Sequence, residues 1–231
     1  RMEKGIVLWP GTGSNRTDTT DNTSTSAKAL KAGNEVNISG GEFKIDSADD
    51  SIHSNGNIVI TGGNISAASG DNGMHADGNL TISDGTVDIT KSYEGIEGSI
   101  VTIDGGTISV VASDDGINCA GGSDTGSTDR MGADQFSSQD GVELNINGGT
   151  ITIDADGDGL DSNGNFTMAG GTVYVCGPTN GGNGALDYNG TATVTGGTLI
   201  ACGAVGMEEG FGDNSTQYSV LHDLGSTVSA N

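Results

Sequence analysis

A repeat of about 22 residues runs through the chain, and it constrains the fold more than any other feature of the sequence. Gly-Gly or Asp-Gly pairs mark the repeats, and their second glycines are Gly41, Gly63, Gly85, Gly106, Gly149, Gly171 and Gly197. The separations between these glycines are 22, 22, 21, 43, 22 and 26 residues. The gap of 43 residues is one repeat plus an insertion, which we place at residues 123–140. Such a period indicates a solenoid of stacked structural units.

Apolar residues recur at fixed offsets from each glycine pair and alternate with Thr, Ser, Asn and Asp. Those three positions before the second glycine are Ile38, Ile60, Ile82, Ile103, Ile146, Met168 and Val194. Those two positions after it are Phe43, Ile65, Val87, Ile108, Ile151, Val173 and Leu199. Alternation with a period of two predicts two short strands per repeat, separated by a glycine corner. A further apolar residue eleven positions after the glycine, as at Ile52 and Met74, predicts a third short strand or turn.

This pattern predicts an all-β fold, a parallel β-helix of about seven coils. With one coil every ~4.8 Å, the rod would be about 34 Å long. A β-sandwich is the rival fold, but its antiparallel hairpins do not require the same residue type at the same offset in every repeat. The calcium-binding nonapeptide β-roll has a much shorter repeat.

The repeats also divide the chain into three parts. Residues 1–33 are interpreted as a polar linker or N-terminal cap, residues 34–210 as the β-helix, and residues 211–231 as the truncated start of a C-terminal segment. We therefore expect a piece of a larger chain. The uncovered end of a β-helix is a strand edge, so such rods can also associate end to end.

The charge of the chain is strongly negative. It has 31 acidic residues against 8 Lys and Arg, which gives a net charge of −23. This balance argues against a nucleic-acid partner, whose phosphates need basic side chains, and against anionic membrane surfaces. No apolar stretch is long enough to insert into a membrane. The balance is compatible with divalent cations that neutralise carboxylates.

Acidic and amide side chains concentrate nine and twelve positions after the glycine corner, where equal offsets predict two stacked columns. The column at twelve positions comprises His53, His75, Glu97, Asn118, Asp161 and Asp187. Carboxylates stacked about 5 Å apart repel one another by about 1 kcal/mol or more per pair near a surface. Ca²⁺ best suits such oxygen ligands, and the candidate ligands are Asp49, Asp50, Asp71, Glu94, Glu97, Asp114, Asp115, Asn118, Asp156, Asp158, Asp161 and Asp187. The alternative is that these residues only form the turns.

Several runs of the sequence resemble a known family. The runs KAGNEVNISGGEFKIDSADDSIHSNGNIVITGG, GDNGMHADGNLTISDGTVDITKSYEGIEG, ASDDGINCAGG and GPTNGGNGALDYNG are similar to the bacterial carbohydrate-binding β-helix family of Gram-positive anaerobes. The resemblance covers Ala27 to Tyr218. It implies a right-handed coil, Ca²⁺ bound at turn carboxylates, and binding of cellulose or of acidic pectin such as polygalacturonate. It also implies a secreted or cell-surface bacterial protein, related in fold to the calcium-dependent pectate lyases.

The relation to lyases raises the question of catalysis. Such lyases combine Ca²⁺ with a Lys or Arg base. No lysine follows Lys91, and Arg130 is the only basic side chain near the acidic group that contains Asp156, Asp158 and Asp161. We therefore expect a binding protein and not an enzyme. A lyase activity through Lys91, which precedes Glu94, remains an alternative. A structural stalk or fibre segment of a surface protein, and ice binding, are two others.

The expected polymer-binding groups lie on the outward side of the strands. A ladder of hydroxyl groups is formed by Thr86, Thr107, Thr150, Thr172 and Thr198. Candidate aromatic platforms for sugar rings are Tyr93, Tyr174 and Tyr188, each of which could instead shield a turn. The insertion, with Arg130 and Phe136, is a candidate ligand-facing loop.

Two of the three cysteines share an offset. Cys176 and Cys202 each lie five positions after their glycine, so we expect them on adjacent coils at a spacing that a disulfide tolerates. Free thiols in a column of small residues are the alternative. Cys119 lies at a different offset.

Overall fold

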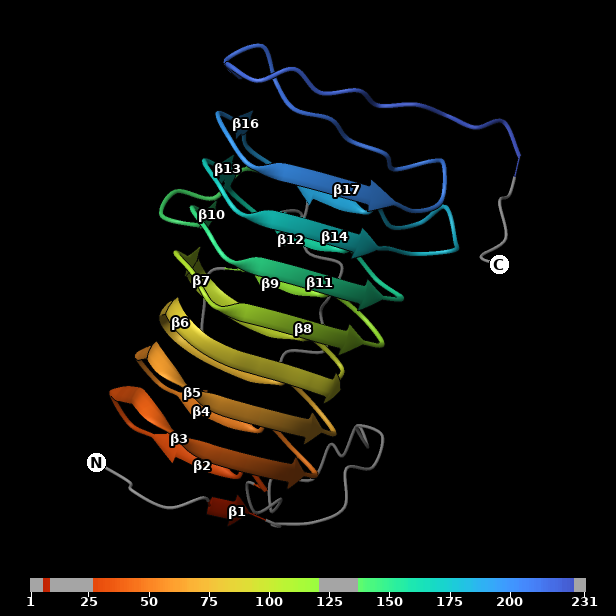
Figure 1. Ribbon diagram of the computed structural model, residues 1–231. Coiled ribbons are helices and arrows are strands. Elements are labelled where there is room, and N and C mark those ends of the chain that lie inside the picture. Colours follow the sequence, from red (N-terminus) through yellow and green to blue (C-terminus); the bar gives the residue numbers. More distant parts are fainter. Residues whose placement is uncertain (1–5, 9–26, 121–136, 227–231) are drawn as a thin grey trace.

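The computed structural model describes residues 6–8, 27–120 and 137–226 (Figure 1). Its strands are β1 (Ile6–Leu8), β2 (Leu30–Ala32), β3 (Glu35–Ser47), β4 (Ile52–Ser54), β5 (Asn57–Ser69), β6 (Met74–Lys91), β7 (Ile96–Ile103), β8 (Thr107–Ala112), β9 (Ile117–Cys119), β10 (Glu143–Ile146), β11 (Thr150–Ala155), β12 (Leu160–Ser162), β13 (Asn165–Met168), β14 (Thr172–Cys176), β15 (Leu186–Tyr188), β16 (Ala192–Val194) and β17 (Thr198–Cys202). Helices are absent from these described ranges, which therefore hold no apolar helix long enough to span a membrane.

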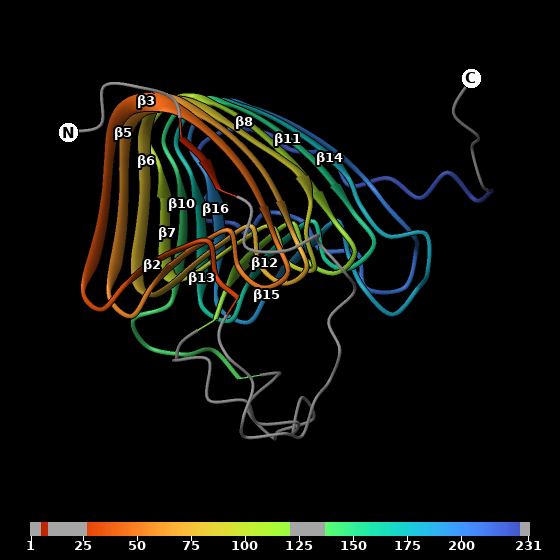
Figure 2. The same cartoon turned by 90° about the horizontal axis from the view of Figure 1, so that it is seen from below.

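Parallel pairing joins each coil to the next and builds three sheets around one interior (Figure 2). Sheet 1 stacks β2, β4, the first residues of β6 and β7, then β9, β12 and β15. Sheet 2 stacks the first halves of β3 and β5, the middle of β6, the end of β7, then β10, β13 and β16. Sheet 3 stacks β1, the second halves of β3 and β5, the end of β6, then β8, β11, β14 and β17. The predicted parallel β-helix is confirmed, including its third short strand.

The coil is right-handed. In Figure 1 the front strands β8, β11, β14 and β17 run from left to right, and each successive strand lies higher than the one before. A chain that crosses the front from left to right while it climbs turns in the right-handed sense.

Ladders of aliphatic side chains in register fill the interior. One ladder consists of Ile38, Ile60, Ile82, Ile103, Ile146, Met168 and Val194, each at most 5% exposed. Burying one such side chain stabilises the fold by roughly 1.5–3 kcal/mol. A low overall hydrophobic content therefore suffices, because only the inward half of each strand contributes to a core that is one coil wide.

The glycine corners explain why the repeat is so regular. The second glycine of all seven pairs has a positive φ, between 83° at Gly149 and 106° at Gly63. Residues other than glycine rarely adopt this backbone conformation. The chain thus turns from sheet 2 to sheet 3 at a position that only glycine occupies without strain.

Two further features concern the ends and the insertion. Residues after β17 return over sheet 2, where the Gly212 N–H donates to the Ala192 carbonyl at 2.9 Å and the Thr216 N–H donates to the Val194 carbonyl at 3.0 Å. Residues 121–136, which include most of the predicted insertion, and most of the predicted linker at residues 1–33 lie outside the described ranges. The strands on either side of the insertion still pair in register, with Val101 opposite Leu144.

Candidate functional site

Two columns of polar side chains follow the corner between sheets 3 and 1. The second column is in strand register throughout, and its members are Lys31, His53, His75, Glu97, Asn118, Asp161 and Asp187. The first column lies three positions earlier and comprises Lys28, Asp50, Asn72, Glu94, Asp115 and Asp158, linked by backbone hydrogen bonds between successive coils. The predicted stacking of both columns is confirmed. A lysine at the start of each column was not predicted.

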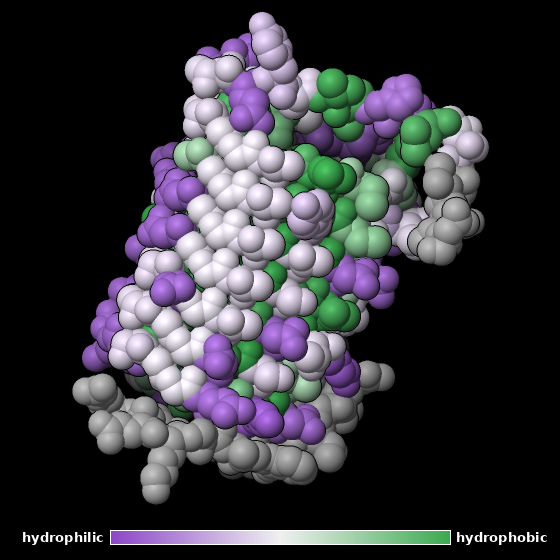
Figure 3. Space-filling view, viewed as in Figure 1, coloured by the Kyte–Doolittle hydropathy of each residue, from purple (hydrophilic) through white to green (hydrophobic). Residues whose placement is uncertain are grey.

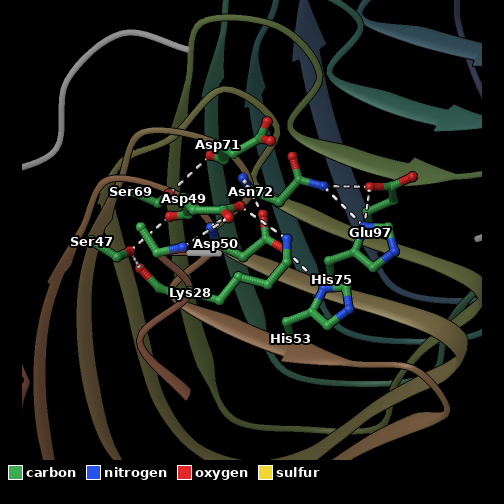
Figure 4. A network of polar contacts seen from close by, with 12 residues as sticks. Lys28, Ser47, Asp49, Asp50, His53, Ser69, Asp71, Asn72, His75 and Glu97 are labelled. Carbon is green, nitrogen blue, oxygen red and sulfur yellow. Dashed lines mark hydrogen bonds and ion pairs between the residues drawn. The ribbon is translucent and has the colours of Figure 1, made fainter. Parts of the chain in front are cut away.

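The first coils of these columns form a network in which charges are compensated (Figure 4). Lys28 Nζ donates to Asp49 Oδ1 at 2.9 Å and also to Asp50 Oδ2. The fully buried Asp50 carboxylate also contacts His53 Nδ1 at 2.8 Å. Burial alone would raise the pKa of Asp50, but the hydrogen bond from His53 and the charge of Lys28 together lower it. Asp49 and Asp50 therefore already have a cationic partner within the fold.

The next coil extends this network through His75. Its ring stacks on that of His53, with centroids 4.9 Å apart and planes inclined by 17°. His75 Nδ1 lies 2.6 Å from Glu97 Oε2, and Nε2 lies 3.0 Å from Asp77 Oδ1. The Asn72 amide also donates to Glu97. The polar groups of these coils thus satisfy one another.

Later coils bring carboxylates together without a cation. One carboxylate oxygen from each of Asp115, Asp158 and Asp161 lies within 4.8 Å of the other two, and no ion pair reaches these side chains among the described residues. We call these three residues the upper acidic cluster. Burial, together with the charges of Asp114 and Asp158, raises the pKa of Asp115 to about 8. Burial also raises the pKa of Asp158 to about 6 and that of Asp161 well above its usual range.

An unsatisfied amide oxygen lies beside this cluster. Asn118 is 8% exposed, and its buried Oδ1 has no hydrogen-bond donor among the residues that the structure describes. Strand register places Asn118 directly between Glu97 and Asp161. Glu94 is a further carboxyl group in an unfavourable environment. Its pKa is raised well above normal by burial and by the charges of Glu97 and Asp115. A buried acceptor without a donor costs about 1–3 kcal/mol. The oxygen atoms gathered here are of the kind that could hold a cation such as Ca²⁺.

The other predicted ligands lie either around this cluster or in the lower coils. Asp187 continues the second column above Asp161, and burial raises its pKa. Asp114 contributes to the raised pKa of Asp115, and the exposed Asp156 lies in the turn before Asp158. Asp71 belongs to the lower coils, where its carboxylate lies within 4.8 Å of those of Asp49 and Asp50.

Glu209 was not predicted as part of the site. It lies in the segment after β17, accepts a hydrogen bond from the Tyr188 N–H at 3.0 Å, and contributes to the raised pKa of Asp158. It follows the last repeat, so its place in the site cannot be predicted from its offset to a glycine corner.

The outer side of sheet 3 is a broad face of small residues (Figure 3). The predicted threonine ladder is in register along it. Tyr174 stands on this face and is 44% exposed, and it lies above Thr152 and below Ile200. Hydrophobic side chains gather toward the upper right of the view in Figure 3. The large apolar or aromatic residues exposed on this sheet include Val111, Tyr174 and Ile200.

The remaining predicted ligand-binding residues are placed differently. The Tyr188 hydroxyl donates to the Gly210 carbonyl, and its ring packs against the core. Tyr93 is partly buried in a turn, where its N–H donates to the Asp71 carbonyl at 2.8 Å. Arg130 and Phe136 lie outside the described residues. Tyr174 is therefore the candidate tyrosine whose ring stands free on a strand face.

The raised pKa values predict an unusual pH dependence in a buffer that contains a chelator. An aspartate in the unfolded chain titrates near pH 4, whereas Asp115 titrates near 8 and Asp158 near 6 in the fold. The folded state therefore holds protons more tightly, and stability falls as the pH rises from about 4 to about 8. Melting temperatures measured with EDTA across this window should decrease, and Asp115→Asn should flatten the decrease. A melting temperature that rises through the window would contradict this electrostatic picture.

Comparison with known proteins gave one match. A family model described as a carbohydrate-binding domain-containing protein matches residues 4–73 and 75–184, which is well over half of the chain. No curated protein and no solved structure matched.

Proposed function

The chain belongs to the family of carbohydrate-binding domain-containing proteins, and on this premise we propose that it binds a plant cell-wall polysaccharide, cellulose or polygalacturonate, with the help of Ca²⁺. We further propose that it acts outside a bacterial cell and has no catalytic role. Lyases of related fold need a basic residue beside Ca²⁺. The sequence has no lysine after Lys91 and a single later arginine, Arg130.

The observation that carries the proposal is the upper acidic cluster beside Asn118. Within the described part of the chain, three carboxylates without a cationic partner and one unsatisfied amide oxygen form a ligand set made only of oxygen atoms. Ca²⁺ prefers six to eight oxygen ligands of this mixed kind, with water completing the set. Asp115, Asp158, Asp161 and Asn118 would hold the ion. A bound cation would favour the charged form of the three carboxylates and oppose the burial and mutual repulsion that raise their pKa values.

The lower coils are a weaker choice for the same ion. There the Lys28 ammonium already contacts Asp49 and Asp50. A second cation at these carboxylates would have to displace Lys28 or lie close to it, which costs free energy in a buried site. We therefore propose the upper acidic cluster as the principal Ca²⁺ site.

We propose the outer side of sheet 3 as the polymer-binding face. Tyr174 offers an exposed ring on which a sugar can stack, and the threonine ladder offers hydroxyl groups at one-coil intervals. The strands of this face lead directly into the corner that carries the acidic cluster, since β11 ends at Ala155 and Asp158 follows three residues later. A Ca²⁺ ion at this corner could also bridge to the carboxylates of an acidic polymer.

Pull-down with insoluble cellulose and with polygalacturonate tests the proposal. We expect Tyr174→Ala to weaken polymer binding about tenfold, because it removes the stacking platform. Tyr218→Ala is the matched control, since Tyr218 is fully exposed on the segment after β17 and is not part of a strand of sheet 3. Equal loss in both variants, or binding of neither polymer by the wild type, would reject sheet 3 as the binding face.

The role of Ca²⁺ is tested separately. A Ca²⁺ concentration of about 100 times the dissociation constant should stabilise the fold by about 2.7 kcal/mol, and this should appear as a higher melting temperature. The double variant Asp158→Asn and Asp161→Asn should lose that response. Polygalacturonate binding that is unchanged by EDTA would show that the ion does not take part in recognition.

A further inference from the structure

Two cysteines face the same side of sheet 3 on neighbouring coils. Cys176 ends β14 and Cys202 ends β17, and strand register places them directly opposite each other. Both side chains are exposed, whereas Cys119 is fully buried in sheet 1 opposite Ser162. The three thiols thus divide into one accessible pair and one isolated, buried group.

The geometry of the pair suits a covalent bond. Adjacent parallel strands lie about 4.7–4.9 Å apart, and disulfides join residues whose Cα atoms are about 4.4–6.8 Å apart. Val173 and Val175 point into the core, so alternation directs Tyr174 and Cys176 outward. The Cys202 thiol donates to the Val175 carbonyl of β14 at 3.4 Å. This contact directs the Cys202 sulfur across the gap between the coils, toward the end of β14.

We propose that Cys176 and Cys202 are a thiol–disulfide exchange site that forms an intramolecular disulfide by reaction with a low-molecular-weight disulfide. This inference does not depend on the proposed carbohydrate function.

The reaction balances in two steps, with oxidised glutathione as the example. One protein thiolate attacks the glutathione disulfide, forms a mixed disulfide and releases one glutathione thiolate. The second protein thiolate then attacks the protein sulfur of the mixed disulfide and releases the second glutathione. The two protein thiols lose two protons and two electrons, and the glutathione disulfide gains both as two thiols.

The surroundings of Cys176 predict how fast this exchange proceeds. Partial burial and the neighbouring Cys202 and Asp154 raise the pKa of the Cys176 thiol. The thiolate is the attacking species, so exchange should be slow at neutral pH and accelerate as the pH rises. Cys119 should not react in the folded protein, because it is inaccessible.

The bond would join the last two coils of sheet 3. It would close the chain between β14 and β17, which includes the turn that donates the Gly184 N–H to Asp158. Closing a loop of this length restricts the unfolded chain. We therefore expect oxidation to raise the melting temperature by about 5–10 °C.

The test is to incubate the folded protein with oxidised glutathione and to count free thiols after denaturation. We expect the count to fall from three to one, with a mass loss of two hydrogen atoms. Cys119→Ser should still form the bond, and its count should fall from two to zero. Cys176→Ser should instead hold one glutathione as a stable adduct. Stable glutathione adducts on the wild-type protein, or three free thiols after incubation at high pH, would overturn the proposal.

Discussion

Replacing Lys28 with methionine will lower the free energy of unfolding by about 3–5 kcal/mol, because it leaves a buried carboxylate without its cation. Asp50 is fully buried, and the Lys28 ammonium is bonded to it and to Asp49. The methionine side chain retains most of the apolar stem, so the loss reports mainly on the charge. Chemical denaturation followed by circular dichroism measures this effect.

An exposed ion pair provides the matched control. Lys44 Nζ lies 3.7 Å from Glu42 Oε1, and the two side chains are 66% and 62% exposed. Lys44→Met should change stability by less than about 1 kcal/mol, since water screens such pairs. Adding Asp50→Asn to Lys28→Met should restore part of the loss by removing the stranded charge. Equal effects of Lys28→Met and Lys44→Met would show that Asp50 does not need its partner.

Replacing Gly116 with alanine will lower the free energy of unfolding by about 2–5 kcal/mol through a steric clash. A Cβ atom at this position would lie 2.3 Å from Ile153 Cγ2 and 2.6 Å from the Gly159 carbonyl oxygen of the next coil. The carbonyl belongs to the backbone, so the coils would have to move apart beside the acidic columns. The drop should be visible as an earlier denaturation midpoint.

Gly33→Ala serves as the comparison for this variant. No atom of the described residues lies within 4 Å of a Cβ atom at Gly33, and its φ is not in the left-handed region. The substitution should therefore leave stability nearly unchanged. A Gly116→Ala protein as stable as Gly33→Ala would mean that the contact between these coils is looser than the structure shows.

The sequence predicted the coils and the columns well because the period encodes them directly. A side chain at a constant offset from Gly63 or Gly85 must stack on its equivalent in the next coil, so the pairing of His53 with His75 and of His75 with Glu97 followed from counting. The glycine corners were predicted for the same reason, and the structure adds that the second glycine of all seven pairs has a positive φ.

Compensation of charge by Lys28 was not predicted, because Lys28 precedes the first glycine pair and has no offset that could be aligned. Glu209 was missed for a similar reason, since it follows the last coil. Lower and upper carboxylates were therefore both predicted as candidate ligands. In the fold, the lower ones contact Lys28 and His53. Among the described residues, Asp115 and Asp158 instead lie beside other carboxylates and accept hydrogen bonds from backbone N–H groups.

The corner between β9 and β10 shows that this architecture tolerates the insertion of about twenty extra residues. The glycine-to-glycine distance doubles there to 43 residues, yet Ile108 still lies opposite Ile151 and Val101 opposite Leu144. Each coil is held by its neighbours and not by the length of its own connections. The equivalent corners at Asn55, Asp77 and Asn163 are thus natural grafting points, where a foreign loop or epitope can be displayed while the scaffold keeps its register.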